Sequence, residues 1–133
     1  MRRTVMFLAS SYLAVGLPAA SALAGTKAPT YKGKTTQHRK LALKVGTRQV
    51  TLRSFTIELK CRDGSTLIDA ESGFEPSALR GGRFKDVQVG STDTVRFAGR
   101  VKGRKATGTL KVTDKFGKVR CASPQVKFTA AGG

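Results

Sequence analysis

The stretch at residues 93–113, DTVRFAGRVKGRKATGTLKVT, decides the fold class. In its second half, apolar and small residues occupy every second position: Ala106, Gly108, Leu110 and Val112. Successive side chains of a β-strand point to opposite faces, so a period of two predicts strands. Gly103 interrupts the pattern, and glycine accepts the positive φ of a tight turn at little cost. The stretch therefore predicts a hairpin with strands at 93–101 and 105–113.

The same alternation recurs on both sides of this hairpin, and turn-forming pairs such as Asp63-Gly64 separate the runs. The strands that we expect are 30–36, 39–45, 48–60, 65–70, 82–89, 93–101, 105–113 and 118–129. No sustained period of 3.6 predicts a long helix. Seven or eight antiparallel strands, with a turn about every 8 to 12 residues, are typical of an all-β sandwich or small barrel.

Irregularities are expected at three places. The parity of the apolar residues slips within residues 52–55 and again within residues 84–87. A slip moves side chains to the wrong face of the sheet unless a bulge absorbs it. We therefore expect bulges near residues 53–54 and 85–86. Pro76 and the three residues after it suggest one helical turn.

The N-terminus has the features of an export signal. Arg2-Arg3 precede an apolar run at residues 5–17, and a small-x-small sequence ends at Ala24. This order predicts a signal peptide at 1–24 that is cleaved after Ala24. The alternative is an uncleaved membrane anchor, but serines, a glycine and a proline dilute the apolarity of the segment. We expect one exported domain at 25–133, secreted and without a transmembrane segment after cleavage.

The composition limits the possible classes of protein. The chain has 133 residues with 25 Lys and Arg against 8 Asp and Glu, which gives a formal net charge of +17. Its hydrophobic content of 39% fits a folded domain, and its length allows one modest core. These values exclude a two-domain enzyme, a multi-span membrane protein, a four-ligand zinc module and a disulfide-dense toxin.

The two cysteines, Cys61 and Cys121, each lie on the inward parity of an expected strand. An even number of cysteines in an exported chain favours a disulfide between them. The alternative is two buried free thiols. A redox role is not expected, because neither cysteine belongs to a C-x-x-C motif.

Catalytic motifs are scarce. His38 is the single imidazole and has no acid close to it in sequence, so we expect a solvated turn residue. Asp69, Glu71 and Glu75 form the densest acidic group and could serve as paired carboxylates. We interpret them instead as a solvated polar edge. No cofactor and no metal site is expected, and the protein is expected not to be an enzyme.

A basic face is the strongest functional signal. From Val95 onward there are ten basic residues and one acid, Asp114. The proposed polyanion-binding residues are Arg96, Arg100, Lys102, Arg104, Lys105 and Lys111. Such a cluster attracts wall polymers, acidic polysaccharides, lipid headgroups or nucleic acid. The alternative is that the charges only keep the protein soluble. Lys60, flanked by Glu58 and Asp63, is expected to contribute little.

Several motifs together carry a resemblance. They are Tyr31-x-Gly33-Lys34-Thr35, Cys61-x-Asp63-Gly64, and Gly99-x-Val101-x-Gly103-x-x-Ala106-Thr107-Gly108. In this order, and over residues 30–130, the chain resembles a group of small secreted bacterial β-rich domains of unknown function. The resemblance implies a signal peptide, one cysteine pair and a β-rich fold, and it implies no catalytic residue.

The function expected from these observations is that of an exported, non-enzymatic module that binds another component of the cell envelope or extracellular space. That component is an anionic polymer or another extracellular protein. A small secreted hydrolase is one alternative. A secreted inhibitor that binds through the loop at 73–82 is another.

Overall fold

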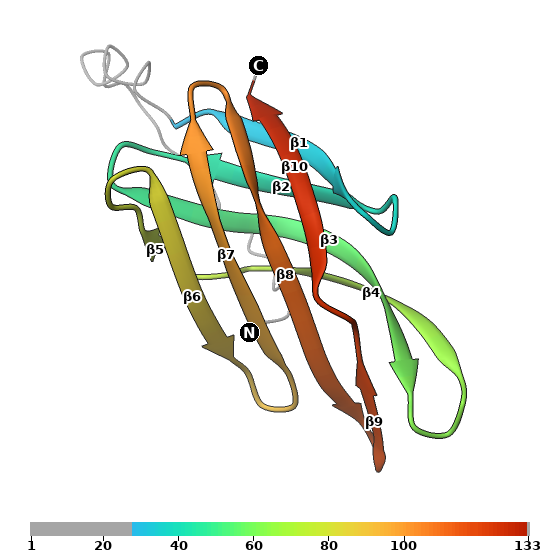
Figure 1. Ribbon diagram of the computed structural model, residues 1–133. Coiled ribbons are helices and arrows are strands. Elements are labelled where there is room, and N and C mark those ends of the chain that lie inside the picture. Colours follow the sequence, from blue (N-terminus) through green and yellow to red (C-terminus); the bar gives the residue numbers. More distant parts are fainter. Residues whose placement is uncertain (1–27, 133) are drawn as a thin grey trace, which may run out of the picture.

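The computed structural model describes residues 28–132, so the expected signal peptide at 1–24 lies outside the described residues. Within them, regular structure consists of strands (Figure 1). These are β1 (Thr30–Thr35), β2 (Lys40–Val45), β3 (Gln49–Cys61), β4 (Thr66–Ser72), β5 (Ser77–Ala78), β6 (Arg83–Val89), β7 (Thr94–Lys102), β8 (Lys105–Phe116), β9 (Val119–Ala122) and β10 (Val126–Gly132).

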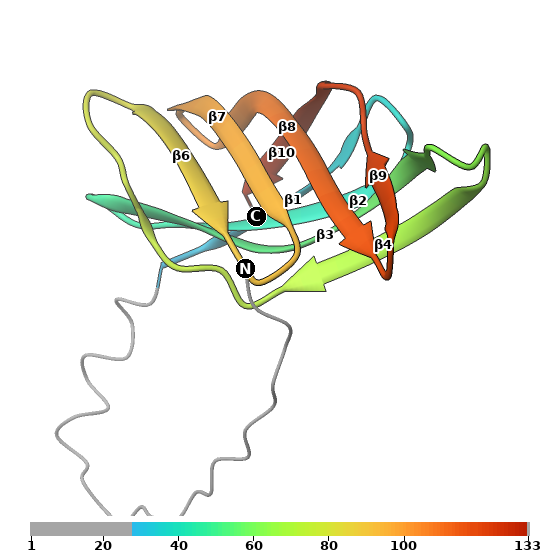
Figure 2. The same ribbon diagram turned by 90° about the horizontal axis from the view of Figure 1, so that it is seen from below.

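The strands close into an antiparallel barrel. Consecutive members of the series β10, β1, β2, β3, β9 and β8 are hydrogen-bonded, and β8 also pairs with β10, which completes a six-stranded ring. β7 and β6 extend the sheet beyond β8, while β4 and β5 pair with β3. Figure 2 shows β6, β7 and β8 in one layer, facing β2, β3 and β4 in the other. The all-β antiparallel prediction is confirmed, but residues 28–132 form ten strands instead of seven or eight.

The inward positions of the strands form one continuous core, and most belong to the alternating runs. A row of four inward residues crosses β6, β7, β8 and β10: Phe84, Gly99, Gly108 and Phe128. A Cβ on Gly99 would lie 2.6 Å from Phe84 Cζ, and one on Gly108 would lie 2.7 Å from Phe128 Cζ. The two glycines therefore leave room for the two aromatic rings inside the barrel.

One of the two expected bulges is present. The register between β2 and β3 shifts after Ala42, which leaves Arg53 as an extra residue on β3. The expectation at residues 85–86 is wrong, because β6 and β7 pair without a shift. The apparent slip has another cause: Val87 and Val89 face outward and are 42% and 70% exposed. The expected helical turn after Pro76 is also wrong, since Ser77 and Ala78 form β5.

The expected strand at 118–129 is two strands, because Pro124 cannot donate a backbone hydrogen bond. Ser123, just before Pro124, is hydrogen-bonded to β8 at this point. Its backbone N–H donates to Val112 O over 2.8 Å, and its Oγ accepts from Val112 N over 2.9 Å. The partner of β8 thereby changes from β9 to β10 without loss of ring closure.

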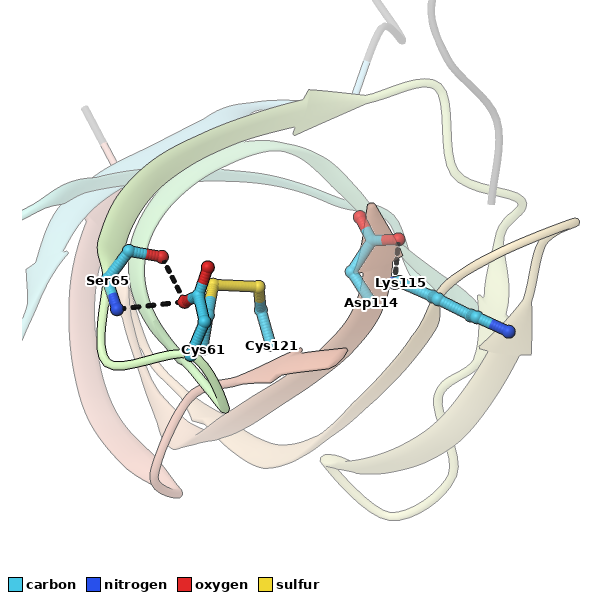
Figure 3. The surroundings of a disulfide bond; sticks show 6 residues. Cys61, Ser65, Asp114, Lys115 and Cys121 are labelled. Atoms are coloured by element: carbon cyan, nitrogen blue, oxygen red, sulfur yellow. Dashed lines mark hydrogen bonds between the residues drawn. A yellow bond between two sulfur atoms is a disulfide. The ribbon is translucent and has the colours of Figure 1, made fainter. Parts of the chain in front are cut away.

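The predicted disulfide between Cys61 and Cys121 is present (Figure 3). The two cysteines are direct cross-strand partners, and Cys121 is in turn opposite Asp114 on β8. Only one further residue pair, Lys60 with Ala122, joins β3 to β9 in the ladder. The disulfide therefore reinforces the shortest strand contact in the ring.

Candidate functional site

The predicted basic residues lie together on the outer surface of the β7–β8 hairpin. Arg96 is directly opposite Lys111, and Lys102 is opposite Lys105. Residues opposite each other on paired strands point to the same face. Arg100 has the same parity as Arg96, so it shares that face, and these five residues are exposed. Their binding role stays a prediction, but their placement on one surface is as expected.

The sixth predicted residue, Arg104, lies in the exposed turn at the tip of the hairpin. Two hydrogen bonds fix this turn against the barrel. Tyr31 Oη donates to Gly103 O over 3.0 Å, and Gly132 N donates to Arg104 O over 2.7 Å. The tip of the basic surface is therefore held by the barrel wall.

Neighbouring strands extend this surface with residues that sequence analysis did not select. Arg83 on β6 is opposite Arg100. Lys85 and Lys127 lie at the two ends of a row that crosses β6, β7, β8 and β10. Cross-strand register, which a single sequence does not specify, was needed to find them. We call the outer surface of β6, β7, β8 and β10, with the hairpin tip, the basic face.

The acidic residues of these strands do not lie on the basic face. Asp114 on β8 is 5% exposed and has inward parity. Asp86 on β6 has the same parity as buried Phe84, and its Oδ2 accepts a hydrogen bond from Ser77 Oγ. No outward position of β6, β7, β8 or β10 carries a carboxylate. The positive charge of the basic face is therefore not neutralised within its own strands.

Four of the eight acids of the chain gather instead between the two layers. Asp69 and Glu71 lie on β4 opposite the buried residues Ile57 and Phe55 of β3, so their side chains point inward. Asp69 Oδ2 and Glu71 Oε2 are buried and have no hydrogen-bond partner. The interpretation of Asp69 and Glu71 as a solvated polar edge is therefore wrong.

The other two members of this carboxylate cluster are Asp93, which is 7% exposed, and Asp114. Sequence analysis did not select either, although the inward parity that continues from Leu110 and Val112 could have identified Asp114. Asp93 precedes β7 and comes close to the cluster only through the pairing of distant strands.

The cluster changes the acidity of its members. Burial, followed by the hydrogen bond and repulsion from Asp69 and then those from Asp93, raises the pKa of Glu71 to about 10. Burial also raises the pKa of Asp114, although hydrogen bonds from Lys115 N and Thr92 Oγ1 act in the opposite direction. Every group that shifts the pKa of Glu71 raises it, so Glu71 is protonated near neutral pH.

One carboxylate oxygen from each of Asp69, Glu71 and Asp114 lies within 4.8 Å of the other two. Carboxylate oxygens are the donors that Ca²⁺ prefers, so these three residues could hold a cation in place of the proton on Glu71. The two buried oxygens without a hydrogen bond are compatible with either arrangement.

The remaining candidates are separate. His38 is exposed in the turn between β1 and β2, where its backbone N–H donates to Thr35 O. Glu75 is exposed in the segment before β5. Within residues 28–132, no helix is long and apolar enough to cross a membrane.

Comparison of the chain with known protein families, with curated proteins and with solved structures gave no match.

Proposed function

We propose that this protein is an exported, non-enzymatic binding module and that its ligand is an anionic polymer of the cell envelope or extracellular space. The observation that carries the proposal is the register of β6, β7, β8 and β10, which gathers cations on one outer face without a carboxylate. The expected signal peptide and the resemblance to secreted β-rich domains support the extracellular setting.

The dimensions of the basic face suit an extended ligand. Outward positions on β8 run from Lys105 to Lys115, a span of about 33 Å at the usual rise of a strand. Thr107, Thr109 and Thr113 lie between the lysines and supply hydroxyl donors. A polymer that neutralises several of these cations releases its bound counterions, so its affinity falls with salt. No helix for a major groove is present in residues 28–132, so we expect charge recognition instead of base recognition.

The test measures binding of polyphosphate, heparin and single-stranded nucleic acid over a series of salt concentrations. For nucleic acid, the logarithm of the association constant should fall linearly with the logarithm of salt, with a slope of about −0.7 to −0.9 per phosphate neutralised. Replacing Arg100, Arg104 and Lys105 together with Ser should weaken binding and reduce the slope by about two to three contacts.

A matched variant distinguishes binding by the basic face from attraction by the net charge of the protein. Replacing Lys40, Lys44 and Arg53 with Ser removes the same charge from outward positions of β2 and β3, in the opposite layer. This variant should bind nearly as tightly as the wild-type protein. If both triple variants lose affinity equally, binding reflects net charge alone. Elution of the wild-type protein from anionic columns below physiological salt would contradict the proposal.

A further inference from the structure

A second cationic feature lies where β3, β9 and β8 meet. Two rows of outward residues cross these three strands. The first row is Lys60, Ala122 and Thr113, and the second is Arg62, Arg120 and Lys115. Four of these six residues are cationic. Together with Thr92, Asp114 and Cys121, these residues line a pocket of about 410 Å³. We call it the cationic pocket. Lys60, which sequence analysis expected to contribute little, is one of its four cations.

The strands beneath the pocket are braced from the inside. The row between the two outward rows consists of Cys61, Cys121 and Asp114, and the first two form the disulfide (Figure 3). Arg62 N also donates to Arg120 O over 2.9 Å. The four cationic side chains thus extend from backbone that is tied by one covalent and several hydrogen bonds, which reduces the entropy lost when a ligand binds.

The charges in the pocket are not neutralised by the protein. None of the four cationic side chains forms an ion pair with a carboxylate of residues 28–132. Asp114 borders the pocket, but its Oδ1 accepts hydrogen bonds from Thr92 Oγ1 over 2.9 Å and from Lys115 N over 2.7 Å. In Figure 3 the Lys115 side chain extends away from the disulfide. The cations are therefore available for an external anion.

We propose that the cationic pocket binds a phosphate group. The planar guanidinium groups of Arg62 and Arg120 offer paired N–H donors that match two oxygens of one oxyanion, and two lysines add compact charges. The hydroxyl of Thr113 can donate to a further oxygen. Four cations neutralise a doubly charged phosphate better than a singly charged carboxylate. The pocket also has room for a sugar attached to the phosphate.

This inference rests on the proposed function and makes it more specific. Lys111, Thr113 and Lys115 are consecutive outward residues of β8, so the pocket lies at one end of the basic face. A polymer that follows the face would place a phosphate in the pocket. The preferred polymer therefore carries phosphate groups, and one whose charges are only carboxylates binds less tightly. A free phosphorylated molecule has the same chemistry, and competition distinguishes the two sources.

The test uses the purified, oxidised protein and pyrophosphate as probe, measured by calorimetry and by shifts of amide NMR signals. Arg62→Gln with Arg120→Gln should weaken pyrophosphate binding at least about tenfold, because charge-assisted hydrogen bonds are lost. Arg48→Gln with Arg53→Gln removes the same charge from exposed positions outside both the cationic pocket and the basic face, and should change the affinity by less than about twofold. Amide shifts should centre on Thr113 and its neighbours in the pocket.

Two results would overturn the assignment: no binding of pyrophosphate to the wild-type protein, or equal loss in the two double variants. All four arginines are exposed, and circular dichroism with thermal unfolding verifies that each variant is folded.

Polyphosphate retention measured in parallel separates the two proposals. If retention fails while pyrophosphate still binds in the pocket, the proposed function is wrong and the pocket stands. If polymers bind but Arg62 and Arg120 are not required for pyrophosphate, the pocket assignment alone is wrong. Displacement of bound polyphosphate by pyrophosphate indicates a shared site, and failure to displace it contradicts the placement of a polymer phosphate in the pocket.

Discussion

Replacement of Glu71 with Gln should raise the stability of the protein at alkaline pH and remove most of its pH dependence. In the folded protein the pKa of Glu71 is raised to about 10 by burial and by Asp69 and Asp93. In the unfolded chain a glutamate ionises near about pH 4.3. Between these values the folded state holds one proton more than the unfolded state. The free energy of unfolding therefore falls as pH rises through this window.

The size of the effect follows from proton linkage. A difference of one bound proton corresponds to about 1.4 kcal/mol for each pH unit. Glu71 is partly exposed, and water screens the repulsion, which shortens the upper end of this pH window and leaves the slope inside it unchanged. The wild-type protein should therefore lose up to about 2.7 kcal/mol of stability between about pH 6 and pH 8. Carboxylates with ordinary pKa values are ionised in both states over this range and contribute no slope.

The assay is urea denaturation followed by circular dichroism at several pH values. At about pH 8, Glu71→Gln should be more stable than the wild-type protein by up to about 4 kcal/mol, and the difference should shrink toward about pH 5. Glu58→Gln is the matched control. Glu58 is on the outward face of β3, 3.8 Å from Arg39, and its loss should change stability by less than about 1 kcal/mol at every pH.

A wild-type protein and a Glu71→Gln variant with the same slope would refute the assignment of the proton to Glu71. A wild-type protein without a slope, which acquires one only after treatment with a chelator, would also refute it. In that case a bound cation, and not a proton, would neutralise the oxygens of Asp69, Glu71 and Asp114.

Three further predictions concern the framework of the barrel. Removing the disulfide by Cys61→Ala with Cys121→Ala should lower the free energy of unfolding by about 2–5 kcal/mol; native protein denatured without reductant should show no free thiol, and two thiol equivalents would contradict this. Gly108→Ala should destabilise the protein by about 1–3 kcal/mol, because the added Cβ would press against Phe128 and the Ala98 carbonyl. An unchanged midpoint of urea denaturation would contradict the close packing of the Phe128 ring against Gly108. Reduction of the disulfide should weaken pyrophosphate binding more than heparin binding. The reason is that the disulfide joins β3 to β9, two strands of the cationic pocket, and none of β6, β7, β8 or β10. Equal weakening of both ligands, measured by calorimetry, would contradict the role of the disulfide in holding the pocket strands.

The disulfide was predicted from the inward parity of its two cysteines together with their even number in a chain expected to be exported. Alternation of side chains was sufficient to predict most of the strands, because it depends on local parity, although it missed β5 and joined β9 to β10. The second half of the β7–β8 hairpin shows why: buried Leu110 and Val112 and exposed Lys111 are where the period of two places them. The method was wrong at residues 85–86, because Val87 and Val89 are apolar but exposed. Apolar residues on a surface are ordinary, so parity read from hydrophobicity alone can slip where the backbone does not.

The carboxylate cluster and the cationic pocket were missed for a different reason. Both depend on which strands become neighbours, and the members of each are spread over distant parts of the chain. Asp69 and Asp114 are 45 positions apart by their numbering, and Lys60 and Arg120 are 60 apart. Barrel closure and the β3–β9 contact bring each set together. A single sequence contains no local signal for such pairings.

The distribution of charge would link folding to the binding that we propose. Placing carboxylates between the layers, where Glu71 takes up a proton, removes negative charge that could have neutralised the cations outside. The outward cations of β6, β7, β8 and β10 then repel one another, and this repulsion opposes folding. The anionic ligand that we propose would reverse the effect, because the cations are gathered on the folded face and dispersed in the unfolded chain. Its binding would therefore stabilise the fold in proportion to the logarithm of ligand concentration relative to its dissociation constant. The disulfide supplies stability that does not depend on the ligand, so the basic face can remain unneutralised in the free protein.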